Sequence, residues 1–195
     1  MSRRLLVILA LLAVAFAVLT GIAVRRGVLA PKPQTAAVGG PFQLVDQSGR
    51  RVDQSVLEGK WSAVFFGYTY CPDVCPTSLL LMQTAVEQLG PDGANKVNLV
   101  FITVDPERDT PELIKGYVSN FGPTIIGLTG TPEQIASAAR AYRVYYQKAP
   151  SKDGGPYLMD HSSILYLLDR NERFITHFTH EAKAEAISAA LRRLL

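Results

Sequence analysis

The hydrophobic pattern divides the chain into two parts. Residues 5–24 form one apolar run without a charged residue, and a helix of that length would measure about 30 Å, the thickness of a bilayer's hydrocarbon core. From residue 41 onward, short apolar runs alternate with segments in which apolar residues recur at helical spacing. The pattern predicts a membrane anchor over residues 1–26, a flexible linker over residues 27–40 and one folded domain over residues 41–195.

The folded part is predicted to alternate strands and helices. The continuously apolar runs at residues 61–68 and 97–104 are typical of strands buried on both faces. The other expected strands and helices are strands at 42–45, 51–52, 125–128, 144–147, 164–168 and 174–178, and helices at 76–89, 110–121, 131–141 and 181–194. This alternation indicates an α/β domain with a central, largely parallel sheet between helices, and the last hairpin adds antiparallel edge strands.

The positive charge of the chain belongs to its N-terminal segment. There are 20 Lys and Arg against 17 Asp and Glu, a formal net charge of +3. Arg3, Arg4, Arg25 and Arg26 flank the apolar run, and without them the chain is nearly neutral. A near-neutral domain without a cluster of basic residues argues against nucleic-acid binding.

The apolar run allows two interpretations. A cleaved signal peptide also begins with basic residues, and Ala-x-Ala triplets occur at residues 13–15 and 15–17. These triplets lie inside the run, and two arginines follow it, which favours an uncleaved anchor with a single membrane span. Because two arginines stand on either side, the charge distribution does not by itself decide the orientation.

The two cysteines lie in one short motif. Cys71 and Cys75 fall in the segment Tyr-Cys-Pro-Asp-Val-Cys-Pro, between the predicted strand at 61–68 and the predicted helix at 76–89. Each precedes a proline, so we expect Cys75 to cap the helix and both thiols to lie exposed on the turn, with pKa values lowered by the helix N-terminus. Such a pair suits soft-metal binding or thiol–disulfide exchange, whereas a structural disulfide would close too small a loop to add much stability.

A histidine would complete a three-coordinate site for Cu(I) at this pair, since zinc requires four ligands. His161 precedes the predicted strand at 164–168, where loops of an α/β sheet converge, and Asp160 is a candidate to orient its ring. On residue type alone, a hydrogen-bonded loop histidine is the more common explanation, and its place among the converging loops favours the ligand role. His177 and His180 are expected to be exposed residues without a ligand role.

Three segments together resemble motifs of the Sco/SenC family. Residues 66–76 (FGYTYCPDVCP) resemble its copper-site motif, residues 104–111 (VDPERDTP) its strand-exit loop, and residues 157–163 (YLMDHSS) its histidine loop. The resemblance covers about residues 41–195 in the right order. It implies a thioredoxin-like fold, tethered to a membrane, in which Cys71, Cys75 and His161 bind copper.

The resemblance also implies a function. The protein would be a metallochaperone for the dinuclear copper centre of cytochrome c oxidase, with the oxidase's copper-bearing subunit as partner and another periplasmic copper chaperone as a candidate donor. The alternative is a thiol–disulfide oxidoreductase that keeps the acceptor cysteines reduced through Cys71 and Cys75. Asp160 and His161 take the place of the thioredoxin cis-proline, which favours the metal site. Asp73 is expected to help set the redox potential or to shape the loop.

The expected location is the bacterial inner membrane, with the domain in the periplasm. Only four residues precede the apolar run, which leaves no room for an organelle transit peptide. Oxidase copper centres are assembled outside the cytoplasm, and the short N-terminus is then expected to stay inside.

Overall fold

The computed structural model describes residues 4, 8–10, 12–14, 16–18, 38–150 and 154–195, in two units that divide after residue 36. The described residues of the first unit are helical up to residue 18. Within the described part of the chain, no helix has the length and apolar character that crossing a membrane requires. Most of the predicted anchor over residues 1–26, and of the predicted linker over residues 27–40, lies outside the described residues.

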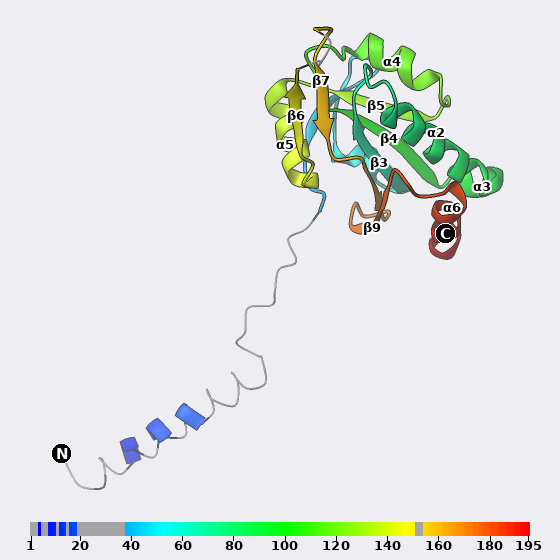
Figure 1. Ribbon diagram of the computed structural model, residues 1–195. Helices are drawn as coiled ribbons and strands as arrows, with labels where there is room; N and C mark the ends of the chain where they lie inside the picture. Colours follow the sequence, from blue (N-terminus) through cyan, green and yellow to red (C-terminus); the bar gives the residue numbers. More distant parts are fainter. Residues whose placement is uncertain (1–3, 5–7, 11, 15, 19–37, 151–153) are drawn as a thin grey trace. The chain divides into compact units, whose positions relative to one another are not determined.

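Nine strands occur among the described residues of the second unit. They are β1 (Gln43–Asp46), β2 (Arg51–Asp53), β3 (Trp61–Gly67), β4 (Val97–Thr103), β5 (Ile125–Thr129), β6 (Tyr146–Ala149), β7 (Leu158–His161), β8 (Ile164–Leu168) and β9 (Phe174–Thr179). Seven of these described strands form one mixed sheet in the order β2-β1-β5-β4-β3-β8-β9 (Figure 1). β3, β4 and β5 are parallel, the outer strands are antiparallel to their neighbours, and β6 pairs with β7 in a separate hairpin.

Helices cover both faces of the sheet. In the described part of the second unit they are η1 (Gln54–Leu57, a 3-10 helix), α2 (Val74–Glu87), α3 (Gly90–Ala94), α4 (Pro111–Ser119), α5 (Pro132–Tyr142) and α6 (Ala184–Leu194). Successive residues of a strand face opposite sides. Phe101 on β4 therefore contacts Tyr117 of α4 on one face, while Phe66 on β3 contacts Tyr142 of α5 on the other. Figure 1 shows α5 on the opposite side of the sheet from α2.

The burial of the two central strands agrees with the apolar runs in the sequence. All seven residues of β3 are buried, and β4 is buried except at Asn98, as expected for strands covered on both faces. Two helices also begin as the sequence predicts, because Thr110 and Thr131 accept hydrogen bonds from the backbone of the first turn and a proline follows each. The prediction of a central α/β sheet flanked by helices is confirmed. The expectation that the sheet is largely parallel is wrong, because among its described strands only β3, β4 and β5 run parallel to one another, while β1 and β8 also pair antiparallel with them.

Several boundaries differ from the prediction. α2 begins at Val74, two residues before the predicted start, because the first-turn N–H groups of a helix have no partner inside the helix and Pro76 is tolerated there. β6 lies two residues later than predicted. α3, η1 and β7 were not predicted, and β7 is short and pairs only with the polar strand β6.

Candidate metal centre

Three side chains from separate segments meet beyond the end of β3. Cys71 comes from the turn after β3, Cys75 from the first turn of α2, and His161 from the last position of β7. Their ligand atoms all lie within 4.8 Å of one another, and no other such group of three or more occurs among the described His, Cys, Asp and Glu residues. Cys75 Sγ is 3.4 Å from His161 Nε2, and both cysteines are free thiols. The structure thus brings together the three residues that the sequence selected.

The two thiols differ in exposure. Cys71 is half-buried, whereas Cys75 is completely buried, so the expectation that both lie exposed on the turn is wrong for Cys75. The reason is that α2 starts early and folds its first turn back onto the end of β3. A Cβ atom on Gly67 would lie only 2.9 Å from Cys75 Sγ, so glycine at the end of β3 makes this close approach compatible with the sheet.

The two thiols also differ in acidity. The S–H of Cys75, followed by His161 and by backbone N–H groups, stabilises the Cys71 thiolate and lowers the pKa of Cys71 to about 4. Burial, together with the neighbouring Cys71 thiolate, raises the pKa of Cys75. The expectation of two thiols with lowered pKa values is therefore correct only for Cys71. A metal that binds both sulfurs must displace the proton of Cys75.

The ring of His161 is held between two aromatic side chains and a carbonyl. Phe65 and Tyr68 contact it edge to face, with ring centroids at 6.1 and 5.8 Å. His161 Nδ1 lies 3.2 Å from the carbonyl oxygen of Ser162, so Nδ1 can donate to that carbonyl, and the lone pair of Nε2 would then be available to a metal.

Asp160 does not orient this ring. Its side chain is exposed, because successive residues of β7 point to opposite sides and Met159 and His161 take the inner one. The acceptor role that the sequence suggested for Asp160 thus belongs to the Ser162 carbonyl.

Asp73 acts through its backbone. The residue caps α2 without a side-chain cap bond, and its carbonyl accepts hydrogen bonds from the N–H and Oγ1 of Thr77 at 3.3 and 2.9 Å. Its N–H is among the groups that stabilise the Cys71 thiolate. These contacts favour the loop-shaping role, and an effect of its charge on the redox potential stays a prediction.

An arginine that the sequence analysis did not single out joins the cysteine turn to the histidine strand. Arg108 pairs with Asp105 and donates from Nη1 to the carbonyl of Tyr157 at 2.9 Å. Its guanidinium also lies 3.8 Å from the ring centre of Tyr157 and 4.8 Å from that of Tyr70. The sequence feature that could have indicated Arg108 is its position in a charged loop directly after a buried parallel strand. Such loops gather at the carboxyl ends of the strands, where functional sites form.

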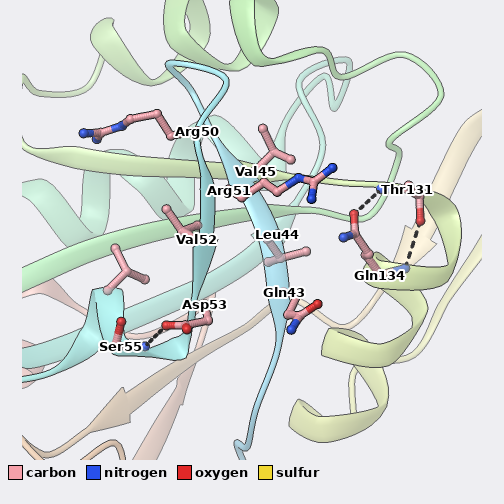
Figure 2. Close-up of a pocket in the computed structure, with 11 residues that line it drawn as sticks. Gln43, Leu44, Val45, Arg50, Arg51, Val52, Asp53, Ser55, Thr131 and Gln134 are labelled. Carbon is pink, nitrogen blue, oxygen red and sulfur yellow. Dashed lines mark hydrogen bonds between the residues drawn. The ribbon is translucent and has the colours of Figure 1, made fainter.

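Away from the three metal ligands, a pocket of about 780 Å³ lies beside the β1–β2 edge of the sheet (Figure 2). It is bounded by the β1–β2 hairpin, η1 and the start of α5, and Figure 2 shows Gln134 turned back onto Thr131 at the helix cap. Its lining contains no cysteine or histidine, so the soft-metal chemistry belongs to the cluster at the end of β3.

The family model described as SCO1/SenC matches residues 30–195. The chain belongs to the SCO1/SenC family. It is 45% identical over 157 residues to the mitochondrial SCO1 homolog 1 of Arabidopsis thaliana, a match that covers 80% of this chain but only 46% of that relative. The chain therefore spans less than half the length of that protein.

Two solved relatives were determined with copper bound. ScoI of Bradyrhizobium japonicum with copper bound is 50% identical, with a TM-score of 0.74, over 82% of this chain and all of that one. ScoI of Arabidopsis thaliana with copper bound is 40% identical, with a TM-score of 0.77, over 81% of this chain and 98% of that one. The thioredoxin-like fold is confirmed, and copper is the metal for which Cys71, Cys75 and His161 offer fitting ligands.

Proposed function

We propose that this protein is a membrane-tethered metallochaperone that delivers copper to the dinuclear centre of cytochrome c oxidase. The observation that carries the proposal is the cluster of two free thiols and one imidazole, in a chain that resembles two structures with copper bound. The family is linked to cytochrome c oxidase assembly. The proposed acceptor is the copper-bearing subunit of the oxidase, and another periplasmic copper chaperone is the proposed donor.

The unequal exposure of the ligands supports an order of transfer. A thiolate of the acceptor could approach a bound ion from the side of the half-buried Cys71 and His161, while the completely buried Cys75 would hold the ion from the inside. Cys75 would then be the last ligand to be replaced. Because burial raises the pKa of Cys75, reprotonation of its sulfur favours release once the acceptor has supplied its own thiolates.

A second function is favoured by the same pair of thiols. The half-exposed Cys71 thiolate can attack a disulfide of the acceptor and form a mixed disulfide, as one acceptor sulfur leaves as a thiolate. Cys75 then loses its proton and attacks Cys71, which releases the second acceptor thiolate and leaves a Cys71–Cys75 disulfide. An external dithiol must reduce that disulfide before another cycle. In this function the protein is a reductase, and His161 is not required.

Replacing the histidine separates the two functions. Reduced protein titrated with Cu(I) against a competing chelator is expected to bind one copper per chain, and His161→Ala is expected to weaken this binding and change the Cu(II) spectrum. The same variant should still reduce a disulfide substrate. Unchanged copper affinity and spectrum in His161→Ala would overturn the assignment of the third ligand.

The membrane tether and the periplasmic location rest on the sequence. The apolar run at residues 5–24 supports a single span, and copper-centre assembly outside the cytoplasm supports a periplasmic domain. A reporter that is active only in the periplasm, fused after Leu195, should give signal, and a cytoplasmic reporter should not. The opposite pattern would contradict both the orientation and the proposed acceptor.

A further inference from the structure

A buried carboxylate reaches the cysteine turn from a distant loop. Asp109 lies just before α4 and is completely buried. Its Oδ1 accepts a hydrogen bond from Thr69 Oγ1 at 2.6 Å, and its Oδ2 accepts one from the Thr69 N–H at 3.0 Å. Thr69 stands two residues before Cys71, and the Cys71 N–H donates to the carbonyl of Tyr68 in the same turn. One side chain thus holds both the backbone and the side chain of the turn that carries the first metal ligand.

Asp109 is itself fixed to the two neighbouring strands. Its Oδ2 also accepts from Thr103 Oγ1 at the end of β4, at 2.6 Å, and its carbonyl accepts from Thr129 Oγ1 at the end of β5, at 2.8 Å. Its N–H donates to the carbonyl of Asp105. The carboxylate is therefore tied to the end of β4 and to the turn that follows β3, and the backbone of Asp109 is tied to the end of β5.

Two buried carboxylates that lie in hairpin turns, those of Asp46 and Asp169, make only local side-chain contacts among the described residues. Within the described residues, the carboxylate of Asp46 accepts hydrogen bonds from Ser48 and Arg50, and the carboxylate of Asp169 accepts them from Asn171 and Arg173. Those bonds shape the turn in which the carboxylate lies. The bonds of Asp109 to Thr69 span 40 residues, so they place one segment relative to another. Burying a carboxyl group is costly, and burial raises the pKa of Asp109, so three donors directed at it indicate a role beyond local turn formation.

We propose that Asp109 is the positioning residue that sets the cysteine turn at the spacing copper requires. The inference rests on the proposed copper site and adds a residue outside its three ligands. Asp109 touches neither sulfur in this role. It holds Thr69, and through the turn it holds Cys71 at a fixed distance from Cys75 and His161. Partners that orient metal ligands in this way typically contribute about 10–100-fold to metal affinity.

The geometry gives a conservative variant and a disruptive one. In Asp109→Asn the remaining oxygen can still accept from the Thr69 N–H and from Thr103 Oγ1, while the amide nitrogen donates to Thr69 Oγ1. This variant removes the charge and keeps the three contacts. Asp109→Ala removes all three contacts, and Asp46→Ala removes a comparable set in the β1–β2 turn and is the matched control.

The test compares these variants as full-length protein, by Cu(I) titration against a competing chelator and by the Cu(II)–thiolate absorption spectrum. Asp109→Ala should bind Cu(I) about tenfold or more weakly and show a shifted spectrum. Asp109→Asn should stay close to wild type, and Asp46→Ala should change neither readout. Equal behaviour of Asp109→Ala and Asp46→Ala would overturn the proposal, as would an asparagine variant as impaired as the alanine variant.

Thr69→Val decides the matter if Asp109→Ala does not fold. It removes one hydrogen bond to Asp109 and leaves the other two. We expect about threefold weaker binding and a smaller spectral shift, and unchanged values would overturn the proposal. Failure of the wild-type protein to bind copper would instead defeat the proposed function, so the two failures are distinguishable.

Discussion

The β1–β2 hairpin differs from the metal edge, the end of β3 where Cys71, Cys75 and His161 meet, in the range of the contacts that hold each together. In the hairpin, the contacts of Asp46 reach residues two and four positions along the chain, and a glycine completes the turn. At the metal edge, the contacts join Thr69 to Asp109 across 40 residues and Cys75 to His161 across 86. A substitution in the hairpin should therefore cost stability alone, whereas one at the metal edge should also change the geometry of the ligands.

The largest loss of copper affinity is expected from Cys75→Ser. The variant loses a sulfur ligand that lies on the buried side of the site, so tight Cu(I) binding should be abolished in a chelator competition. Ser48→Ala in the hairpin is the contrasting change, since it removes one hydrogen bond to Asp46 and should cost about 1 kcal/mol of stability without affecting copper. Copper binding by Cys75→Ser at wild-type affinity would remove the distinction between the two regions.

The next effect is a difference in reactivity between the two cysteines. Because the pKa of Cys71 is lowered to about 4 and that of Cys75 is raised, Cys71 is the thiolate at pH 6. Brief treatment of the reduced, metal-free protein with iodoacetamide should modify Cys71 at least about 100-fold faster than Cys75, as mapped by mass spectrometry. The rate at Cys71 should fall only as the pH drops through about 4. Equal labelling of both residues at pH 6 would contradict the asymmetry.

How much the sequence predicts differs between the same two regions. The turn of the hairpin at residues 42–52 follows from its Asp-x-x-Gly pattern, because the hydrogen bonds of the Asp46 carboxylate are local. The pairing of β1 with β5, and the bonds of Gln47 to Ile125 and Gly127, join distant segments and required the tertiary structure. The buried strands β3 and β4 follow from their apolar runs. The three metal ligands were found from ligand chemistry and family resemblance, whereas their distances required the tertiary structure.

The predictions that were wrong at the metal edge concern features that depend on contacts between distant segments. The burial of Cys75 depends on the close approach of α2 to Gly67, and the outward direction of Asp160 depends on the register of β7 against β6. The contacts of Arg108 and Asp109 join segments far apart in the sequence. The sequence indicates that the loop holding Arg108 lies at the carboxyl ends of the strands, but no local pattern specifies the distant partners of these residues.

Two glycine substitutions, one at each region, test whether a local change affects stability alone or copper binding as well. A Cβ at residue 67 would lie 2.9 Å from Cys75 Sγ and from a ring carbon of Phe65, so Gly67→Ala should cost about 1–3 kcal/mol and also weaken copper binding. Gly49 has a φ of +82° with open space around it, so Gly49→Ala should cost about 1 kcal/mol through backbone strain alone. Urea unfolding and Cu(I) titration of both variants check this. Equal copper affinity of Gly67→Ala and wild type would mean that the thiol can move without consequence.

The smallest effect is the pH dependence of the hairpin. Burial by itself would raise the pKa of Asp46, but hydrogen bonds from Ser48 and Arg50 prevail and lower it to about 2. Since the folded-state pKa lies below the unfolded value near 4, the ionised group stabilises the fold above about pH 4, and this contribution disappears as the pH falls towards 2. Because its partner Arg50 is largely exposed to solvent, we expect only about 1–2 kcal/mol.

Urea unfolding of wild type and Asp46→Asn at several pH values between 5 and 2 measures this contribution. The difference in unfolding free energy should be greatest at pH 5 and should shrink steadily towards pH 2, because protonation of Asp46 in the wild type removes the same charge that the variant lacks. Copper affinity at neutral pH should be the same in both proteins, since the bonds of Asp46 stay within its own turn. A stability difference that is independent of pH would contradict the lowered pKa of Asp46. A loss of copper affinity in Asp46→Asn would mean that the hairpin and the metal edge are coupled.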